Sequence, residues 1–307
     1  MRKVTCPGLP ANWVNGWLAS VGITVLDPRL RLHWSPDTIP VAVISAESAD
    51  PVDILVSAWP SGAMLADFPV AETWSSESPS DEVSLPRKVS VEALRARMRA
   101  ARQHLYSWTL TSTLTDLCVD EKGKAGHARF DPAGTGPMGC LHDRLTKAHA
   151  HIDFDSRRDR IQSSLEGRGR RVAHNGLGFD QTRIGSQSDK QPGNKNKWTD
   201  PVVEVLTFFG LALLPVRGPG VDRRLSPSAE LSVRQRGWQK SKKSGQCFFW
   251  PAWKQPLGRA GIDALLDAWS PEMPRTWDRY GIHAAWMSVQ YMHSDRDMTR
   301  AYGARRL

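Results

Sequence analysis

The apolar residues of the first sixty positions follow first a helical and then a strand period. Through residues 12–22 they recur every three or four positions, which predicts a helix that Asn12 caps and Gly22 ends. At 30–34 apolar residues alternate with polar ones, and a second apolar run follows at 41–44. These two runs predict a pair of neighbouring strands, so the start of the chain is expected to mix helix and strand.

Three further helices are predicted from start signals and apolar periodicity. Two of them begin at an Asp-Pro pair, because Asp caps free N–H groups and Pro is pre-set for the first helical turn. Asp50 is expected to begin a helix over 51–59, and Asp200 a largely buried helix of about three turns over 201–214. Residues 90–108 are predicted to form a helix with one apolar and one basic face. A basic helix face usually indicates a solvated surface, with phosphate contact as the alternative.

The last quarter of the chain is expected to contain a hairpin followed by helices. Two strand-like stretches flank the basic loop 239–245, which predicts an antiparallel hairpin with lysines at its tip. Residues 261–269 and 276–292 are predicted to be helices. The tail from His293 has little apolar content and is expected to be frayed or disordered unless a partner holds it.

Together these elements predict an α+β protein of mixed helices and short antiparallel strands, largely a single compact domain. Two stretches, 75–86 and 120–139, are rich in Ser, Pro or Gly and are predicted to be loops. Within the domain we distinguish an acidic α+β portion (1–86), a helical portion with a loop (87–156) and a basic α+β portion with C-terminal helices (157–307).

Charge is distributed unevenly along the chain. The 307 residues carry a formal net charge of +9, and 40% of them are hydrophobic, which is enough to form a core. Residues 157–254 contain 19 Lys and Arg against 8 Asp and Glu, a charge of +11, whereas the first 86 residues hold 4 basic against 10 acidic groups. A one-sided basic surface attracts phosphates, so a polyanionic partner is predicted.

Cysteine usage and hydropathy indicate a soluble cytoplasmic protein with no membrane partner. Cys6, Cys118, Cys140 and Cys247 lie far apart and lack the spacing of a disulfide framework or a zinc site. The longest apolar stretch, 202–216, is too short to span a bilayer, and the N-terminus has no apolar run of the length that a signal peptide needs.

Two pieces of the basic stretch have a composition that suits contact with phosphate groups. In the Arg- and Gly-rich segment 168–197, Gly176 and Gly178 are expected to let backbone N–H groups approach phosphate oxygens. In the basic hairpin, Trp238 either stacks on bases or turns into the core while the lysines stay in water. The candidate nucleic-acid-binding residues are Arg168, Arg170, Arg171, Arg183, Lys195, Lys197, Arg234, Arg236, Trp238, Lys240, Lys242 and Lys243.

One cluster of metal-ligand residues suggests a catalytic alternative. His149, His151, Asp153 and Asp155 alternate, so on a strand all four would face one side, as the ligands of a phosphodiester-cleaving metal site would. The same residues also fit as solvated polar groups that continue the amphipathic segment before them. Since the sequence contains no second acidic cluster with recognisable spacing, we assign no catalytic residue, metal or cofactor and keep a nuclease as the runner-up.

A family resemblance is carried by five segments in a fixed order: GLPANWVNGWLASVGITVLDPRLRLHW, GLGFDQTR, DPVVEVLTFFGLALLPVRG, RQRGW and FFWPAWKQPL. The chain resembles the large or accessory subunits of type I-G (formerly I-U) CRISPR effector complexes. Those subunits similarly begin with a helix that leads to an LxW strand, and later carry a helix that begins at Asp-Pro before a W-P-L strand. The likeness spans most of the chain, although the typical large subunit is much longer.

The resemblance implies a non-catalytic, nucleic-acid-binding subunit of a CRISPR RNA-guided surveillance complex. Such a subunit contacts CRISPR RNA and target DNA among the other subunits of a multi-protein effector complex, while a separate helicase-nuclease cleaves the strand. Two alternatives stay open. One is a metal-dependent nuclease of a prokaryotic defence system that uses the His/Asp cluster, and the other is a protein-protein adaptor with a basic docking face.

Overall fold

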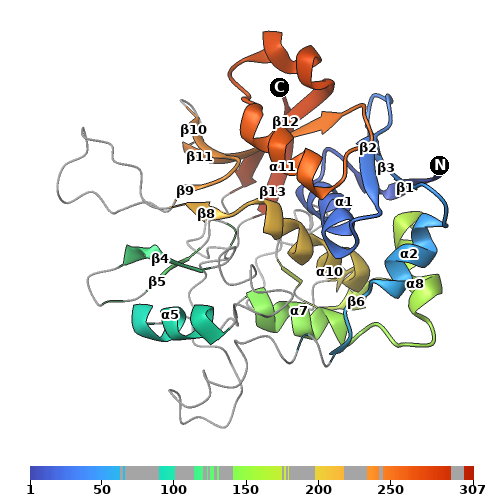
Figure 1. Cartoon of the computed structure of the whole chain (residues 1–307), viewed down its shortest axis with the longest axis horizontal. Helices are drawn as coiled ribbons and strands as arrows, with labels where there is room; N and C mark the ends of the chain where they lie inside the picture. The colour runs from blue at the N-terminus through green and yellow to red at the C-terminus, as the bar shows by residue number, and fades with distance from the viewer. Residues whose placement is uncertain are drawn as a thin grey trace.

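The structure is a computed structural model with an α+β fold (Figure 1). It combines helices with antiparallel strands in small sheets, which confirms the predicted fold class. The structure describes residues 1–62, 65, 90–100, 114–119, 123, 125–127, 130, 141–174, 176–177, 179, 198–217, 234–241, 245–291 and 301–307.

The N-terminal sheet has three antiparallel strands in the order β1-β3-β2. Strands β2 (Arg31–Trp34) and β3 (Val41–Ala46) form the predicted pair, with Arg31 opposite Ser45. Strand β1 (Arg2–Pro10) was not predicted. Its Pro and Gly residues interrupt the strand period, and the register indeed shifts at the end of β1.

Two buried helices cross at the centre of the molecule (Figure 1). They are α1 (Val14–Leu26) and α10 (Pro201–Gly210), and all ten residues of α10 are buried. A Cβ at Gly22 of α1 would lie only 2.0 Å from the carbonyl oxygen of Leu206, so the two backbones are in direct contact there. The prediction that Gly22 ends the first helix was therefore wrong, because this glycine permits helix packing while α1 continues to Leu26.

The C-terminal sheet has four antiparallel strands in the order β10-β11-β12-β13, which are labelled in Figure 1. They are β10 (Trp238–Ser241), β11 (Gly245–Trp253), β12 (Ile282–Tyr291) and β13 (Ala301–Arg306). Indole N–H groups join this sheet to the N-terminal part of the chain: Trp250 Nε1 donates to the Ala11 carbonyl at 2.7 Å and Trp253 Nε1 to that of Leu32 at 2.9 Å.

Two predictions for the end of the chain were wrong. Residues 276–292 do not form one helix: a 3-10 helix, η3 (Pro274–Tyr280), stops at Gly281, whose φ of 68° lies in the left-handed region, and β12 follows. Because β12 lies between two strands and its residues 284–288 are buried on both faces, its apolar residues run almost continuously and imitate a helical pattern. The tail is not frayed over 301–306, which pairs with β12 as an edge strand.

The remaining elements surround these sheets and the central helix pair. Helices α2 (Pro51–Ser57) and α11 (Arg259–Ala268) confirm their predictions, and Asp50 caps α2 by accepting the N–H of Val52 at 2.7 Å. The other elements are α5 (Val91–Ala100), β4 (Leu114–Val119), β5 (Ala125–His127), α7 (Leu141–His149), α8 (Arg157–Leu165), β6 (Val172–Ala173), β7 (Trp198–Thr199), η2 (Leu211–Leu213), β8 (Val216–Arg217) and β9 (Arg234–Gln235).

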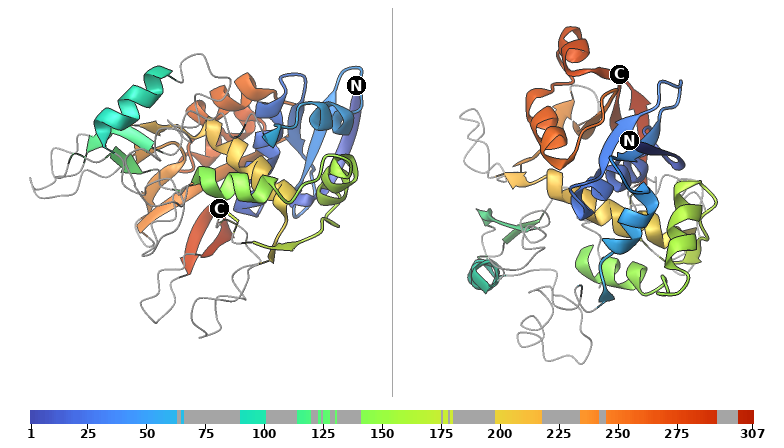
Figure 2. Two further views of the ribbon diagram at one scale, coloured as in Figure 1. Left: turned by 90° about the horizontal axis from the view of Figure 1, so that it is seen from below. Right: turned by 45° about the vertical axis from the view of Figure 1, so that its right-hand side comes forward.

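Helix α5 and the β4-β5 ribbon lie on the opposite side of the molecule from β1, β2 and β3 (Figure 2). Helix α5 confirms the start of the helix predicted for 90–108, whose last eight residues lie outside the described part of the chain. Strand β5 lies inside the stretch 120–139 that was predicted to be loop, so that prediction was wrong for 125–127. The predicted loop 75–86 lies outside the described residues.

The buried apolar side chains that the structure describes form a hydrophobic cluster from Cys6 to Trp286. It includes Leu32, Leu145 and Phe208, so it takes in residues from all three portions distinguished in the sequence. None of the described helices has the length and apolar content to cross a bilayer.

Candidate nucleic-acid interface

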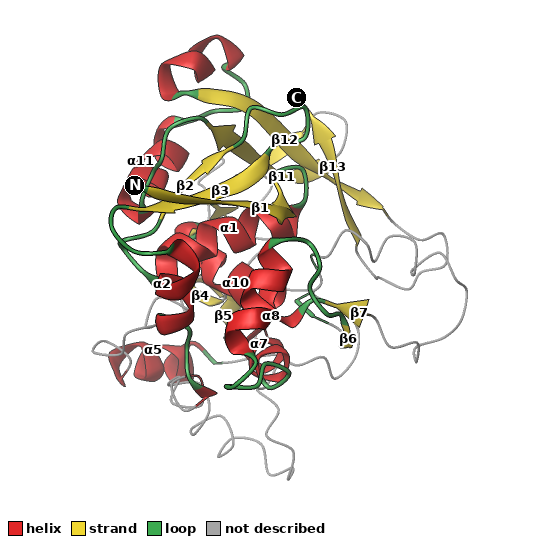
Figure 3. Ribbon diagram, turned by 90° about the vertical axis from the view of Figure 1, so that its right-hand side faces the viewer, coloured by secondary structure: helices red, strands yellow, loops and turns green. Residues whose placement is uncertain are grey.

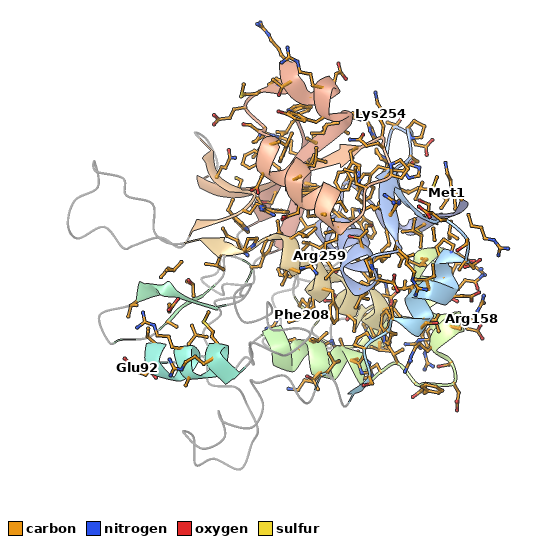
Figure 4. All side chains as sticks on the ribbon, viewed as in Figure 1. Met1, Glu92, Arg158, Phe208, Lys254 and Arg259 are labelled. Atoms are coloured by element: carbon orange, nitrogen blue, oxygen red, sulfur yellow. The ribbon has the colours of Figure 1, made fainter. Side chains whose placement is uncertain are left out.

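Helix α8 carries three arginines, of which Arg158 is exposed and Arg157 and Arg160 are half-buried. Its Ile161 and Leu165 are buried, one helical turn apart, whereas Arg158 and Asp159 are exposed. The C-terminal end of α8 is held against β1, where a Cβ at Gly8 would lie 2.0 Å from the carbonyl oxygen of Ser164. The helix lies next to α2 at the edge of the molecule, and Arg158 lies at its periphery while Phe208 lies in the interior (Figure 4).

Six arginines and two acidic residues lie between residues 157 and 171. Arg158 forms an ion pair with Asp53 of α2 at 3.0 Å, and Arg168 forms one with Glu166. Hydrogen bonds from Gln162 and then from the Arg168 guanidinium hold the pKa of Glu166 below its usual value. Each pair places a carboxylate beside a guanidinium and so weakens the positive potential there, and the six arginines less the two acidic residues leave residues 157–171 with a formal charge of +4.

An exposed aromatic ring lies at each end of this basic segment. Phe154, in the turn before α8, is 78% exposed, and the guanidinium carbon of Arg157 lies 4.7 Å from its ring centroid. Trp198 is 60% exposed on β7, where it pairs with Ala173 of β6, and its carbonyl accepts a hydrogen bond from Arg171 Nη1 at 3.2 Å.

Contacts between two histidines connect the two ends. The rings of His151 and His174 meet edge to face with centroids 5.7 Å apart. Arg160 Nη2 donates to the carbonyl of His151 at 3.3 Å, and Thr199 Oγ1 donates to that of His174 at 3.4 Å. We call the surface formed by residues 151–160, 168–174 and Trp198 the α8 strip; its helix and the β6-β7 pair lie side by side in Figure 3.

The N-terminus of α10 lies behind the strip and anchors it. Asp200 caps α10 by accepting the N–H of Val202 at 3.0 Å, and it also accepts from Ser164 Oγ of α8 at 3.0 Å. A Cβ at Gly169 would lie 1.8 Å from the other carboxylate oxygen of Asp200, so the arginine-rich segment passes directly over this cap. Burial raises the pKa of Asp200, and its hydrogen bonds oppose that rise.

The glycine-rich loop binds an internal carboxylate. The N–H of Leu177 donates to Glu204 Oε2 at 2.6 Å, and a Cβ at Gly176 would lie 2.5 Å from Glu204 Oε1. Buried Arg144 of α7 donates to the carbonyl of Gly176 at 3.1 Å. The expectation that Gly176 brings the backbone close to a phosphate was therefore wrong, because Glu204 of α10 occupies that place; Gly178 lies outside the described residues.

The strand that the metal-site alternative requires is not formed. His149 ends α7, and the chain continues in turns through His151, Asp153 and Asp155 to α8. His149 Nε2 lies 2.7 Å from the carbonyl oxygen of Pro60, and burial lowers its pKa. The N–H of Ile152 bonds back to His149 and its side chain is buried, so helical turns replace the alternation of a strand. Among the described residues, no three His, Cys, Asp or Glu side chains are grouped as metal ligands would be.

The predicted hairpin exists, but its first strand begins later than predicted. Gly237, with a φ of 80°, separates β9 (Arg234–Gln235) from β10, so Lys240 lies within β10 and not at the tip. Lys242 and Lys243 lie outside the described residues.

Two of the candidate residues in this hairpin have structural roles. The side chain of Arg236 is only 8% exposed: Nη1 donates to the Leu213 carbonyl at 2.8 Å and to Asp263 at 2.5 Å, and Nη2 pairs with Asp267 at 2.9 Å. Trp238 is half-buried and packs against Phe130 and Phe248, so its ring turns toward the core, which is the alternative to base stacking that the sequence left open. We therefore correct both assignments.

The described candidates that lie together on the surface are Arg168, Arg170 and Arg171, all of which are exposed. The side chains of Arg234 and Lys240, and the whole of Arg183, Lys195 and Lys197, lie outside the described part of the chain.

Sequence reasoning did not single out Phe154, Arg157, Arg160 or Trp198. The apolar pair Ile161 and Leu165, four residues apart in a polar stretch, was a usable signal, since it predicts a short helix with its arginines outward. No protein-family model matches the chain, and no curated protein or solved structure is similar enough to it to indicate a relationship.

Proposed function

We propose that this chain is a nucleic-acid-binding subunit of a CRISPR RNA-guided surveillance complex and that the α8 strip contacts the sugar-phosphate backbone. The observation that carries the proposal is the concentration of six arginines within fifteen residues, three in α8 and three in the segment that follows it, beside exposed aromatic rings. The family resemblance of the sequence supplies the biological setting. In such complexes base pairing reads the sequence while the protein binds backbone and shape.

The arrangement suits phosphate binding for two physical reasons. Arginine presents a planar set of donors that matches phosphate oxygens, and its charge is permanent. The strip is also held in place by α8, by the cap of α10 and by the β6-β7 pair, so its backbone loses little conformational entropy when a ligand binds. The nuclease alternative loses the strand on which its His/Asp cluster depended, because His149 ends α7 and the chain continues in turns.

The salt dependence of binding tests the proposed surface. The variant R168Q/R170Q removes two exposed charges from the strip, whereas R275Q/R279Q removes two exposed charges from η3 and serves as the matched control. If each arginine contacts one phosphate, the slope of log K against log salt should fall by about 1.4 for a single strand or about 1.8 for a duplex. The control should keep the wild-type slope. Equal slopes in all three proteins would contradict the assignment of the strip.

The identity of the bound nucleic acid tests the biological setting. The chain, purified from a host that carries the CRISPR locus, should retain RNA whose sequence derives from the repeat. Sequencing of that RNA is the measurement. Retained RNA without enrichment of repeat sequence would reject the surveillance complex but keep nucleic-acid binding. If no nucleic acid is retained and an acidic protein is recovered instead, the chain is a protein-protein adaptor with a basic docking face.

A further inference from the structure

Exposed aromatic rings are confined to one surface in the part of the chain that the structure describes. The exposed ones are Phe154 and Trp198, and both belong to the α8 strip. The other large apolar side chains that are exposed, such as Ile39 and Met273, have no ring. Burial of an aromatic ring stabilises a fold, and at these two positions the fold does not gain that stabilisation.

The Phe154 ring and the backbone of Trp198 are held in position. The Arg157 guanidinium over the Phe154 ring restricts the motion of that side chain. The backbone of Trp198 is fixed by its pairing with Ala173 and by the hydrogen bond from Arg171 to its carbonyl. Such fixed platforms lose little conformational entropy when a planar group stacks on them.

Cationic groups lie beside both platforms and along the path between them. Arg157 is next to Phe154, Arg171 is next to Trp198, and Arg160 contacts the backbone of the histidine pair that joins them. Surfaces that bind single-stranded nucleic acid combine aromatic rings with arginines, because bases stack on the rings and phosphates pair with the guanidinium groups.

We infer that the α8 strip binds unpaired nucleotides, with Phe154 and Trp198 as two platforms on which bases stack. In a duplex the faces of the bases are already stacked on one another, and only a single strand or an unpaired end presents them to a protein ring. The inference rests on the proposed function. It adds that the ligand is single-stranded and that Phe154 and Trp198 are the residues that select a single strand over a duplex.

Fluorescence anisotropy with labelled oligonucleotides tests the inference on the full chain. The ligands are single-stranded RNA and single-stranded DNA of about 15 nucleotides, a length that matches known single-strand site sizes, and the duplex of the same DNA sequence. The variants are F154A and W198A, their conservative counterparts F154W and W198F, and the control variants I39A and M273A, which shorten exposed apolar side chains away from the strip. Circular dichroism confirms that each variant is folded.

We expect F154A and W198A each to weaken single-strand binding on the order of 5- to 150-fold while duplex binding stays unchanged. F154W and W198F should retain most of the affinity, and the control variants all of it. Comparison of the RNA and DNA strands identifies which sugar the strip prefers.

Three outcomes would count against these conclusions in different ways. If the alanine variants bind single strands as tightly as the wild type, while R168Q/R170Q binds more weakly, the stacking inference is wrong and nucleic-acid binding stands. The same conclusion follows if the alanine variants lose duplex and single-strand binding equally. If the wild-type chain binds none of the oligonucleotides at low salt, both the inference and the proposed function are wrong.

Discussion

Substitution of Gly22 by alanine tests the central helix contact. In an ordinary helix this change is stabilising by about 1 kcal/mol, because glycine is the poorer helix former. Here the added Cβ would lie 2.0 Å from the carbonyl oxygen of Leu206, and ordinary van der Waals contact begins only at 3.4 Å. The clashing atom belongs to the backbone of α10, so no side-chain rotation relieves it, and the two helices have to separate by about 1.4 Å.

The expected cost of that separation exceeds the gain in helix propensity. Overpacking of a core typically costs about 1–3 kcal/mol and sometimes more. Because α1 and α10 are both buried along most of their length, a shift of one helix disturbs the packing of many side chains. The contact is with a backbone atom, so we take the upper end of that range, about 3 kcal/mol, and subtract the propensity gain of about 1 kcal/mol. We therefore expect G22A to reduce the free energy of unfolding by about 2 kcal/mol, where propensity alone predicts an increase.

Urea unfolding followed by tryptophan fluorescence and circular dichroism measures the change. The matched control is G261A in α11, where the nearest atom is the end of the flexible Leu257 side chain at 3.2 Å. That variant should be neutral or more stable by up to about 1 kcal/mol. A G22A protein as stable as the wild type would refute the close approach of α1 and α10.

Two other changes test parts of the fold near the candidate interface. R236M should lower the free energy of unfolding by about 2 kcal/mol, because charged hydrogen bonds to α11 and to Leu213 are lost. Urea unfolding measures this change. Unchanged stability together with a smaller salt slope of nucleic-acid binding would instead show that Arg236 contacts the nucleic acid. For Asp200, burial raises the folded-state pKa above the ordinary 3.8, so the folded protein binds that proton more tightly than the unfolded chain. The stability that this proton contributes is present below pH 3.8 and is lost as pH rises through the raised pKa of Asp200. D200N should remove this pH dependence when the free energy of unfolding is measured across the same pH range. A D200N protein with the pH profile of the wild type would contradict the prediction.

Two of the three predicted helix caps are confirmed, because a cap of this kind is a local interaction; the predicted Asn12 cap was wrong, since α1 begins after Trp13 and no side chain caps it. Asp50 and Asp200 each accept a hydrogen bond from the N–H two residues later, and nothing distant is needed to form it. The short strand pair at 31–34 and 41–46 was predicted for the same reason, since its alternation and turn lie within sixteen residues. Signals of this kind also established the α+β class.

The end of the chain shows where local signals fail. Residues 282–291 have an apolar pattern that fits a helix, and they form a strand because β11 and β13 supply hydrogen bonds on both edges. The tail residues 301–306 have little apolar content of their own, and pairing with β12 places them in the sheet. In both cases the partner, and not the segment itself, determines the conformation.

The candidate interface divides in the same way. Composition by itself located the basic third of the chain and its arginines, but it treated Arg168 and Arg236 as equivalent. The fold separates them, because two carboxylates of α11 and a carbonyl of η2 surround Arg236 while Arg168 remains exposed.

Composition, charge and local patterns in the sequence therefore determined the fold class, several helix starts and the positive sign of one region. The tertiary structure decided which arginines and rings reach solvent, which glycine faces a neighbouring backbone and which backbone N–H groups are already bound by Glu204. Those properties depend on groups that are distant in the sequence, such as Leu206 for Gly22 and Asp267 for Arg236, and only folding brings them into contact.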